Sequence, residues 1–214
     1  MTPSLAAQAY DTVEAMIVTL KLPPGTVFSE AELREQVGFG RTPLREALQR
    51  LTSDRLLVTM PRRGMMVTAI DLVDFHALLE TRRALDGLIA ARAARRATPI
   101  QHEAFAAQLD AMQQAAAVGD LDAFMLADRA ADEVLAAAAQ NPFAAQAVAP
   151  LHAHCRRFWY AHQHNGDLAR SADLHQHVLA AVRARDPRMA EAATDTLIDY
   201  LDAFRLAVAT GIPR

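Results

Sequence analysis

The sequence predicts a mainly α protein, with a small mixed unit at the N-terminus and an antiparallel helical bundle after it. Glycines and prolines divide the first part into short elements, whereas the remainder is an alanine-rich helical pattern with few breaks. Of the 214 residues, 52% are apolar and 22% are charged, which is ordinary for a globular chain and excludes a disordered one. We therefore expect two domains, residues 1–70 and residues 71–214.

Two helices open the first domain. Apolar residues at helical spacing indicate a helix over residues 5–20, which ends before a Pro-Pro-Gly turn. Ser29 and Glu32 have the spacing of a capping box, in which each side chain accepts a hydrogen bond from the backbone of the other residue. We expect this pair to begin a second helix that ends near Gly38.

A third helix and a hairpin complete the first domain. Thr42-Pro43 opens the helix with proline in its first turn, where the missing N–H costs little. Residues 56–60 and 65–70 are expected to form two strands around a Pro-Arg-Arg-Gly turn. Three helices followed by such a hairpin are typical of a winged helix-turn-helix domain.

The second domain is expected to be an antiparallel six-helix bundle. Connections of a few residues imply that consecutive helices are antiparallel neighbours. The breaks are Thr98-Pro99, Gly119-Asp120, Asn141-Pro142, Asn165-Gly166 and Asp186-Pro187. The expected helices cover residues 71–95, 99–118, 121–139, 142–164, 168–185 and 187–210.

Charge is distributed unevenly along the chain. The formal net charge is −3, yet residues 41–63 hold six arginines against Glu46 and Asp54. Such a local basic patch is typical of a surface that binds nucleic acid. Cys155 is the single cysteine and cannot form an internal disulfide, and neither a signal peptide nor a long apolar stretch is visible. We therefore expect a cytoplasmic protein with no membrane partner.

The strongest chemical signal lies in the first domain. Arg41, Thr42 and Arg45 stand at the start of the third helix, the end of a recognition helix that enters the major groove of DNA. Arg63 and Gly64 stand at the hairpin tip, where a wing reaches the adjacent minor groove. These five residues are the candidate DNA contacts. The alternative is an arginine-rich surface that is merely solvated.

Polar residues also fall on apolar helix faces of the second domain. Asp128 and Asp132 lie on one such face, Arg82 on another, and His175 on a third. A buried charge without a partner costs several kcal/mol, so a cluster of this kind is paired, metal-bound or arranged around a cavity. We expect a ligand cavity. The alternative is a self-satisfied network in which Arg82 pairs with Asp86 and His175 bonds to a carboxylate.

The segment Gly-Phe-Gly-Arg-Thr-Pro-Leu-Arg-Glu-Ala-Leu over residues 38–48 resembles the signature of the GntR family of bacterial transcriptional regulators. The helical remainder is similar to the FCD effector domain of the FadR subfamily, in its smaller VanR-like version. The resemblance implies that Arg41, Thr42, Arg45 and Gly64 contact operator DNA, with Arg63 beside them.

Two positions of the first domain depart from the family pattern. Gly40 stands where the family usually has Ser or Thr, so a hydroxyl contact to phosphate is missing. Ala31 stands where some members carry an arginine that contacts DNA. We expect docking on the duplex to survive both changes, with altered affinity or base preference.

The resemblance also implies a divalent metal site in the second domain. The family ligands are Asp-x-x-x-His on one helix and two later histidines, of which Asp128 and His175 match, whereas Asp132 and Leu197 replace the other two histidines. The remaining set of Asp128, Asp132 and His175 favours Mn, Mg or no metal over Zn or Ni.

Other polar residues of the bundle complete this picture. His152 and His154, on the fourth bundle helix, are the histidines that could replace the missing ligands. Arg82 matches a Glu-x-Arg pattern of the first effector helix, which implies that it anchors a carboxylate of the effector. The expected effector-binding residues are therefore Arg82, Asp128 and His175.

Together these features predict a homodimeric, ligand-responsive regulator, a repressor that binds a palindromic operator and is released by a small organic acid. One alternative is a DNA-binding dimer whose bundle is purely structural. Another is an all-α metalloenzyme that uses Asp128, Asp132 and His175. We expect no enzyme, because the sequence shows no recognisable nucleophile, cofactor loop or glycine-rich phosphate motif.

Overall fold

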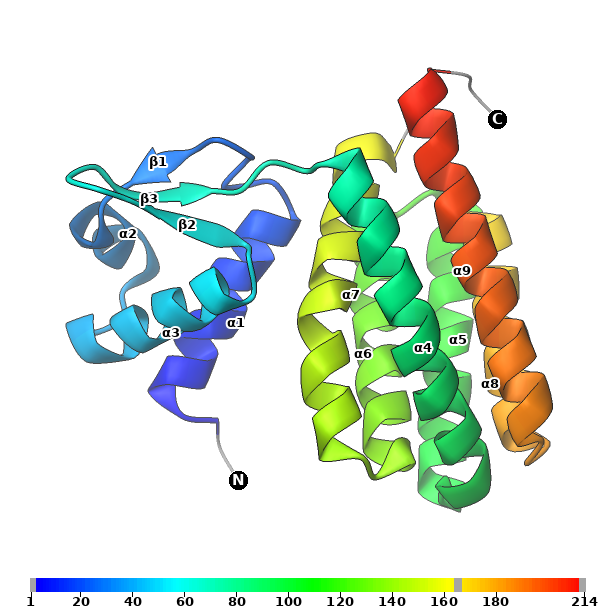
Figure 1. The fold of residues 1–214 in the computed structure, drawn as a ribbon. Coiled ribbons are helices and arrows are strands. Elements are labelled where there is room, and N and C mark those ends of the chain that lie inside the picture. Colours follow the sequence, from blue (N-terminus) through cyan, green and yellow to red (C-terminus); the bar gives the residue numbers. More distant parts are fainter. Residues whose placement is uncertain (1–2, 164–166, 212–214) are drawn as a thin grey trace. The chain divides into compact units, whose positions relative to one another are not determined.

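The computed structural model describes residues 3–163 and 167–211. Its contacts divide the chain into two compact units. The first runs up to Asp71 and also includes Ala153–Ala161, and the second comprises the rest of the described chain from Leu72 onwards. The predicted fold class, a winged helix-turn-helix followed by a helical bundle, is confirmed (Figure 1). The sequence placed the domain boundary between residues 70 and 71 and did not assign Ala153–Ala161 to the first unit.

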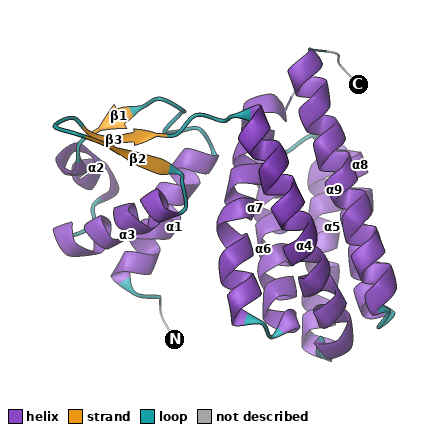
Figure 2. Ribbon diagram, viewed as in Figure 1, coloured by secondary structure: helices purple, strands orange, loops and turns teal. Residues whose placement is uncertain are grey.

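Within its described residues, the first unit contains three complete helices, part of a fourth, and a three-stranded antiparallel sheet of order β1-β3-β2. The elements are α1 (Leu5–Val18), β1 (Val27–Phe28), α2 (Glu30–Val37), α3 (Arg41–Ser53), β2 (Leu57–Met60) and β3 (Gly64–Val67). Figure 2 shows the sheet beside the three helices. The hairpin β2–β3 was predicted, whereas β1 was not. Its two residues are too few to show the alternation that marks a strand.

Local capping decides where α2 and α3 begin. Ser29 and Glu32 form the expected capping box at α2, and Gly38 ends that helix with a φ of +75°. Glycine suits this position because it adopts positive φ without a steric penalty. At α3 the N-cap is Gly40, which has no side chain to accept a hydrogen bond from the first turn. The first backbone N–H groups of α3 therefore lack a side-chain cap.

The core of the first unit fixes which face of α3 points outward. Leu44, Leu48 and Leu51 are at most 2% exposed and pack with Val13 and Ile17 of α1. Burying each leucine contributes roughly 1.5–3 kcal/mol. The opposite face of α3, which carries the arginines, is therefore held at the surface.

Residues of α7 (Pro142–His162) complete the first unit. His154 donates from Nε2 to the carbonyl of Asp54 at 2.9 Å. The fully buried Arg157 donates to the carbonyl of Thr68 and, at 3.2 Å, to its hydroxyl. Burial lowers the pKa of Arg157 to about 10. The earlier residues of the same helix, which include Pro150, belong to the second unit.

The second unit is built from helices within its described residues. They are α4 (Leu72–Arg96), α5 (Pro99–Val118), α6 (Leu121–Ala139), the first part of α7, α8 (Leu168–Arg183) and α9 (Pro187–Thr210). The predicted spans agree with these bounds to within about two residues, as boundaries usually do. The predicted end of one helix at residue 164 and the break at Asn165-Gly166 lie outside the described residues. None of the described helices is both long enough and apolar enough to cross a membrane.

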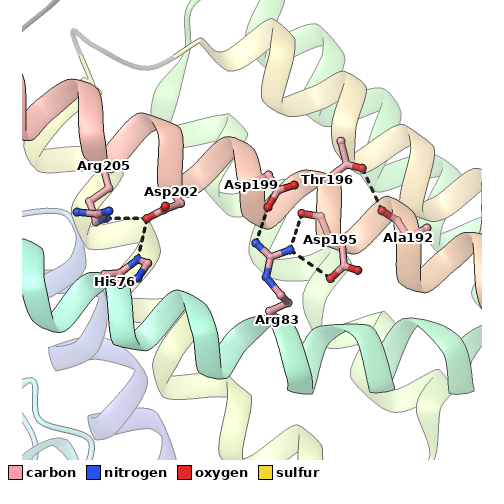
Figure 3. A network of polar contacts seen from close by, with 8 residues as sticks. All are labelled: His76, Arg83, Ala192, Asp195, Thr196, Asp199, Asp202 and Arg205. Carbon is pink, nitrogen blue, oxygen red and sulfur yellow. Dashed lines mark hydrogen bonds and ion pairs between the residues drawn. The ribbon is translucent and has the colours of Figure 1, made fainter.

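Polar contacts join α4 to α9 along the surface of the second unit (Figure 3). Arg83 donates from Nη2 to Asp199 Oδ1 at 2.5 Å. His76 Nδ1 and Arg205 Nε both lie within hydrogen-bond distance of Asp202 Oδ1, at 3.0 and 2.7 Å. The Arg83–Asp199 pair is exposed and contributes at most about 1 kcal/mol, so it helps to align the two helices rather than supply the core stability. The Arg205–Asp202 contact lies within α9 and positions the carboxylate that faces His76.

Candidate functional site

The outer face of α3 carries the predicted DNA contacts of the helix. Arg41, Thr42 and Arg45 are all exposed, while Leu44 of the same turn is fully buried. Arg41 Nε lies 3.6 Å from Oε1 of Glu30, which begins α2. The helix N-terminus adds a partial positive charge at this end. The arrangement presents two guanidinium groups and a helix N-terminus to an incoming anion, as binding to a phosphate backbone requires.

The hairpin supplies the second predicted contact region. Arg63 is exposed in the turn between β2 and β3, and Gly64 is half-buried with a φ of +100°. A Cβ at Gly64 would lie 2.3 Å from the carbonyl oxygen of Phe28, an approach that real side chains do not make. Glycine is therefore required here by the packing of the hairpin against β1, in addition to any role beside DNA.

A groove of about 540 Å³ lies between α3 and the hairpin. Its lining combines one basic group and a single carboxylate with uncharged polar groups, a glycine and two apolar side chains. The residues are Glu30, Arg45, Leu48, Gln49, Thr52, Ser53, Thr59, Gly64 and Met65. Arginine and glutamine are side chains that read base edges in the major groove, and hydroxyl groups contact phosphates. The groove thus has the chemistry of a nucleic-acid interface.

The second unit encloses a small cavity of about 40 Å³. At roughly 10–15 Å³ for each water molecule, it has room for about three waters. Its polar lining consists of Arg82, Asp86, Asp132, His152, His175 and Thr194. Its apolar lining consists of Ile89, Ala90, Ala131, Leu135, Val178, Leu179 and Leu197. Several helices of one bundle therefore direct polar groups to a common interior point, as ligand sites in bundles do.

Two carboxylates of the cavity are bridged by one imidazole. His152 Nε2 lies 2.8 Å from Asp86 Oδ1, and His152 Nδ1 lies 3.0 Å from Asp132 Oδ2. Arg82 donates from Nε to the other oxygen of Asp86 at 2.9 Å. Burial opposes ionisation of Asp86, but Arg82 and His152 outweigh it and lower the pKa of Asp86 to about 2. Burial likewise opposes the charged form of His152, but Asp132 and Asp86 raise its pKa to about 9.

His175 and Asp128 form a further ion pair in the second unit. His175 Nε2 is 3.0 Å from Asp128 Oδ1, and His175 Nδ1 is 2.8 Å from the carbonyl oxygen of Ser171. Burial works against protonation of His175, and Asp128 outweighs it, so the pKa of His175 is raised. The imidazole and the carboxylate therefore neutralise each other inside the bundle.

The structure brings together most of the residues predicted for this site. Arg82, Asp132 and His175 line the cavity, and Asp128 contacts His175. His152, named only as a possible replacement ligand, lies at the centre. The contacts of Arg82 with Asp86 and of His175 with a carboxylate are those that the alternative interpretation, a self-satisfied network, expected.

Of the two histidines expected as possible replacement ligands, His152 lines the cavity and His154 does not. His154 does not reach the cavity, because it contacts Asp54 in the first unit. Sequence reasoning named Asp86 only as the partner of Arg82 in the alternative interpretation, and it did not name Thr194. The only available signal was the spacing of four residues between Arg82 and Asp86.

The donors of the cavity do not fit a bound metal ion. Each candidate ligand is engaged with another side chain or with a carbonyl group, and Leu197 adds only hydrocarbon where the resemblance implies a ligand. Within residues 3–163 and 167–211, no three His, Cys, Asp or Glu side chains are grouped as a metal ion requires.

Two family models match this chain. Residues 5–67 match the model described as bacterial regulatory proteins, gntR family, and residues 77–200 match the FCD domain model. The second match alone covers more than half of the chain and contains every polar residue of the cavity.

Relatives and a solved structure agree with these matches. A protein from Paenarthrobacter nicotinovorans named "Probable D-xylose utilization operon transcriptional repressor" is 28% identical over 201 residues, which are 94% of this chain and 88% of that relative. An HTH-type transcriptional regulator of Agrobacterium vitis is 34% identical over 134 residues, 61% of this chain and 78% of that relative. The structure of E. coli McbR/YncC has a TM-score of 0.85 and 21% identity, covers 97% of this chain and 100% of its own, and supports the fold.

Proposed function

This chain belongs to the GntR family of bacterial regulatory proteins and carries an FCD domain, and we propose that it is a repressor that a small organic anion releases from its operator. DNA binding and transcriptional regulation follow from the family. The sign of the regulation, the effector class and the residues that contact DNA and effector are the proposed part. The observation that supports the proposed effector site is the cavity of the second unit, which the buried Arg82 lines.

The proposed DNA contacts are Arg41, Thr42, Arg45, Arg63 and Gly64. Their support is the exposed N-terminal face of α3 and the adjoining groove, which also contains Arg45 and Gly64. Two copies of the unit in a homodimer would read the two halves of a palindromic site, because a two-fold symmetric dimer matches a two-fold symmetric sequence.

The proposed effector contacts are Arg82, Asp128 and His175. Arg82 is only 7% exposed, lines the cavity and presents a planar fork of donors, which matches a carboxylate well. At about 40 Å³ the cavity is far smaller than the roughly 300 Å³ or more of most ligand pockets. An organic anion must therefore widen it.

This requirement supplies a mechanism of release. A ligand shifts an equilibrium between two arrangements only by the difference in its affinity for them. The cavity residue His152 and the residues Ala153–Ala161 of the first unit lie on the same helix, α7. Widening the cavity around His152 would shift Ala153, the next residue of α7. In this proposal, that shift is how effector binding affects the first unit.

The second candidate function is a regulator whose bundle only supports dimerisation. One observation favours it: Arg82, His152 and His175 already have carboxylate partners without any ligand. Such a bundle would be stable as it stands.

One experiment separates the two functions. The purified full chain is incubated with a panel of sugar acids, hydroxy acids and dicarboxylates, and its melting temperature and its affinity for a selected operator are measured. An effector must raise the melting temperature and weaken operator binding, since it binds the native state. If no compound in a broad panel changes either quantity, the purely structural bundle is supported and the effector proposal fails.

A further inference from the structure

We propose that the cavity of the second unit is organised without a metal ion, and that the side chain of His152 is the cation that joins two of its carboxylates. This inference rests on which atoms face one another across α4, α6, α7 and α8.

The contacts of His152 define the state of its ring. Both ring nitrogens lie at hydrogen-bond distance from carboxylate oxygens, one on Asp86 and the other on Asp132. Ionised carboxylates only accept hydrogen bonds, so both ring nitrogens donate. A ring that donates from both nitrogens carries a positive charge and offers no lone pair to a metal ion.

Arg82 completes the first half of the cluster. Its Nε donates to the Asp86 oxygen that does not face His152, so Asp86 accepts from both cations. The side chains of Arg82 and His152 are each only 8% exposed, and that of Asp86 is 13% exposed. Charges this deeply buried require partners, and the partners here come from the protein itself.

His175, the other candidate ligand histidine, also has acceptors facing both ring nitrogens. His175 Nδ1 faces the carbonyl oxygen of Ser171, which can only accept, so this nitrogen carries a hydrogen. His175 Nε2 faces Asp128. The nitrogen that would bind a metal is thus directed at a carboxylate at 3.0 Å.

Each carboxylate of the cluster contacts a cationic side chain. Three cationic side chains, Arg82, His152 and His175, face three carboxylates, Asp86, Asp128 and Asp132. A divalent ion would have to displace the buried cations that these carboxylates already contact, which is unfavourable because the displaced charges would lose their partners. The imidazolium of His152 thus occupies the bridging role between Asp86 and Asp132 that a metal ion could otherwise take.

The first test uses the full-length, untagged wild-type chain. After dialysis against EDTA and then against metal-free buffer, it is titrated calorimetrically with MnCl₂ and NiCl₂, and its melting temperature is recorded with EDTA and with each metal. We expect no stoichiometric binding and an unchanged melting temperature. One bound metal per chain, or a melting temperature that EDTA lowers, would overturn the metal-free cavity.

The second test creates the metal site that His152 prevents. His152→Ala leaves Asp86 and Asp132 facing a gap without their shared cation, so its melting temperature should fall by roughly 6–20 °C. Mn²⁺ at about a hundred times its dissociation constant should raise that temperature by roughly 5–11 °C. His177→Ala is the matched control, because His177 is exposed on α8 and does not line the cavity.

The outcome for His152→Ala decides the role of this residue. If the variant has the melting temperature of the wild type, and Mn²⁺ does not change it, His152 is not the bridging cation. If the variant does not fold, His152→Gln replaces it, since the amide fills the space without carrying charge. The wild-type titration decides the metal-free state in either case.

Discussion

Arg45→Ala should remove most sequence-specific DNA binding while leaving the fold intact. Arg45 is exposed on the outer face of α3 and lines the groove beside the hairpin. Its neighbours in the helix, Leu44 and Leu48, hold α3 in the core and are unaffected by the substitution. Exposed positions without special contacts change stability by at most about 0.5 kcal/mol, so the variant should melt with the wild type.

The expected loss of affinity follows from the chemistry of the contact. A bidentate contact between arginine and guanine is worth about 1–3 kcal/mol of discrimination. At about 1.4 kcal/mol for each factor of ten, this corresponds to a loss of roughly 5- to 150-fold. If Arg45 contacts only phosphate, binding should instead weaken equally for all sequences, and the slope of log affinity against log salt should decrease by about one.

Fluorescence anisotropy with a selected operator and with a scrambled duplex, each at several salt concentrations, distinguishes these cases. Arg183→Ala is the matched control, because it removes the same charge from an exposed position of α8 in the second unit. Full sequence-specific affinity of Arg45→Ala, with the salt slope unchanged, would refute the assignment of this face to DNA.

Three further predictions concern the wing, the cavity and pH. Gly64→Ala should lower the free energy of unfolding of the first unit by more than about 2 kcal/mol in urea, because the new Cβ meets the backbone oxygen of Phe28. Gly119→Ala is the control, because Gly119 also has a positive φ but faces open space, and it should cost about 1 kcal/mol. Equal costs would contradict the steric argument. Arg82→Lys keeps the charge but loses the planar fork, so calorimetry should show a carboxylate effector bound at least about tenfold more weakly, with operator affinity unchanged in its absence; undiminished effector affinity would remove Arg82 from the site. The free energy of unfolding should fall by up to about 3 kcal/mol between about pH 6.5 and 9. The pKa of His152 is about 6.5 in the unfolded chain and about 9 in the folded protein. The protonated ring therefore stabilises the fold fully below about pH 6.5, and this contribution is lost as the pH rises through about 9. Urea unfolding of His152→Gln over this range should show a shallower slope, and an identical slope would contradict the bridging contacts.

Much of the fold could be predicted because its signals are local. The capping box of Ser29 and Glu32, and the proline in the first turn of α3, define helix starts from neighbouring residues alone. The breaks of the bundle that fall on described residues are likewise marked within the sequence, by Gly119-Asp120 and by the X-Pro pairs at Pro99, Pro142 and Pro187. β1 escaped prediction because its partner, β3, lies far along the chain and its two residues carry no pattern.

The candidate site was predictable in part, for a related reason. Helical spacing placed Arg82, Asp132 and His175 on inward faces, and the structure puts them around one cavity. Spacing does not show which residue on another helix each side chain meets. The central position of His152 depends on the depth and rotation of α7 against α4 and α6, and these are set by tertiary packing.

Pro150 lies inside α7, two residues before His152. Proline has no N–H to donate to the carbonyl four residues earlier, so one backbone hydrogen bond of the helix is missing. The helix therefore bends more easily in this turn. The turn of α7 that bends most easily thus lies next to the cavity residue His152, and Arg157 lies on the regular part of the helix that follows. A small shift of the imidazole costs less elastic energy at this point than it would in an unbroken helix.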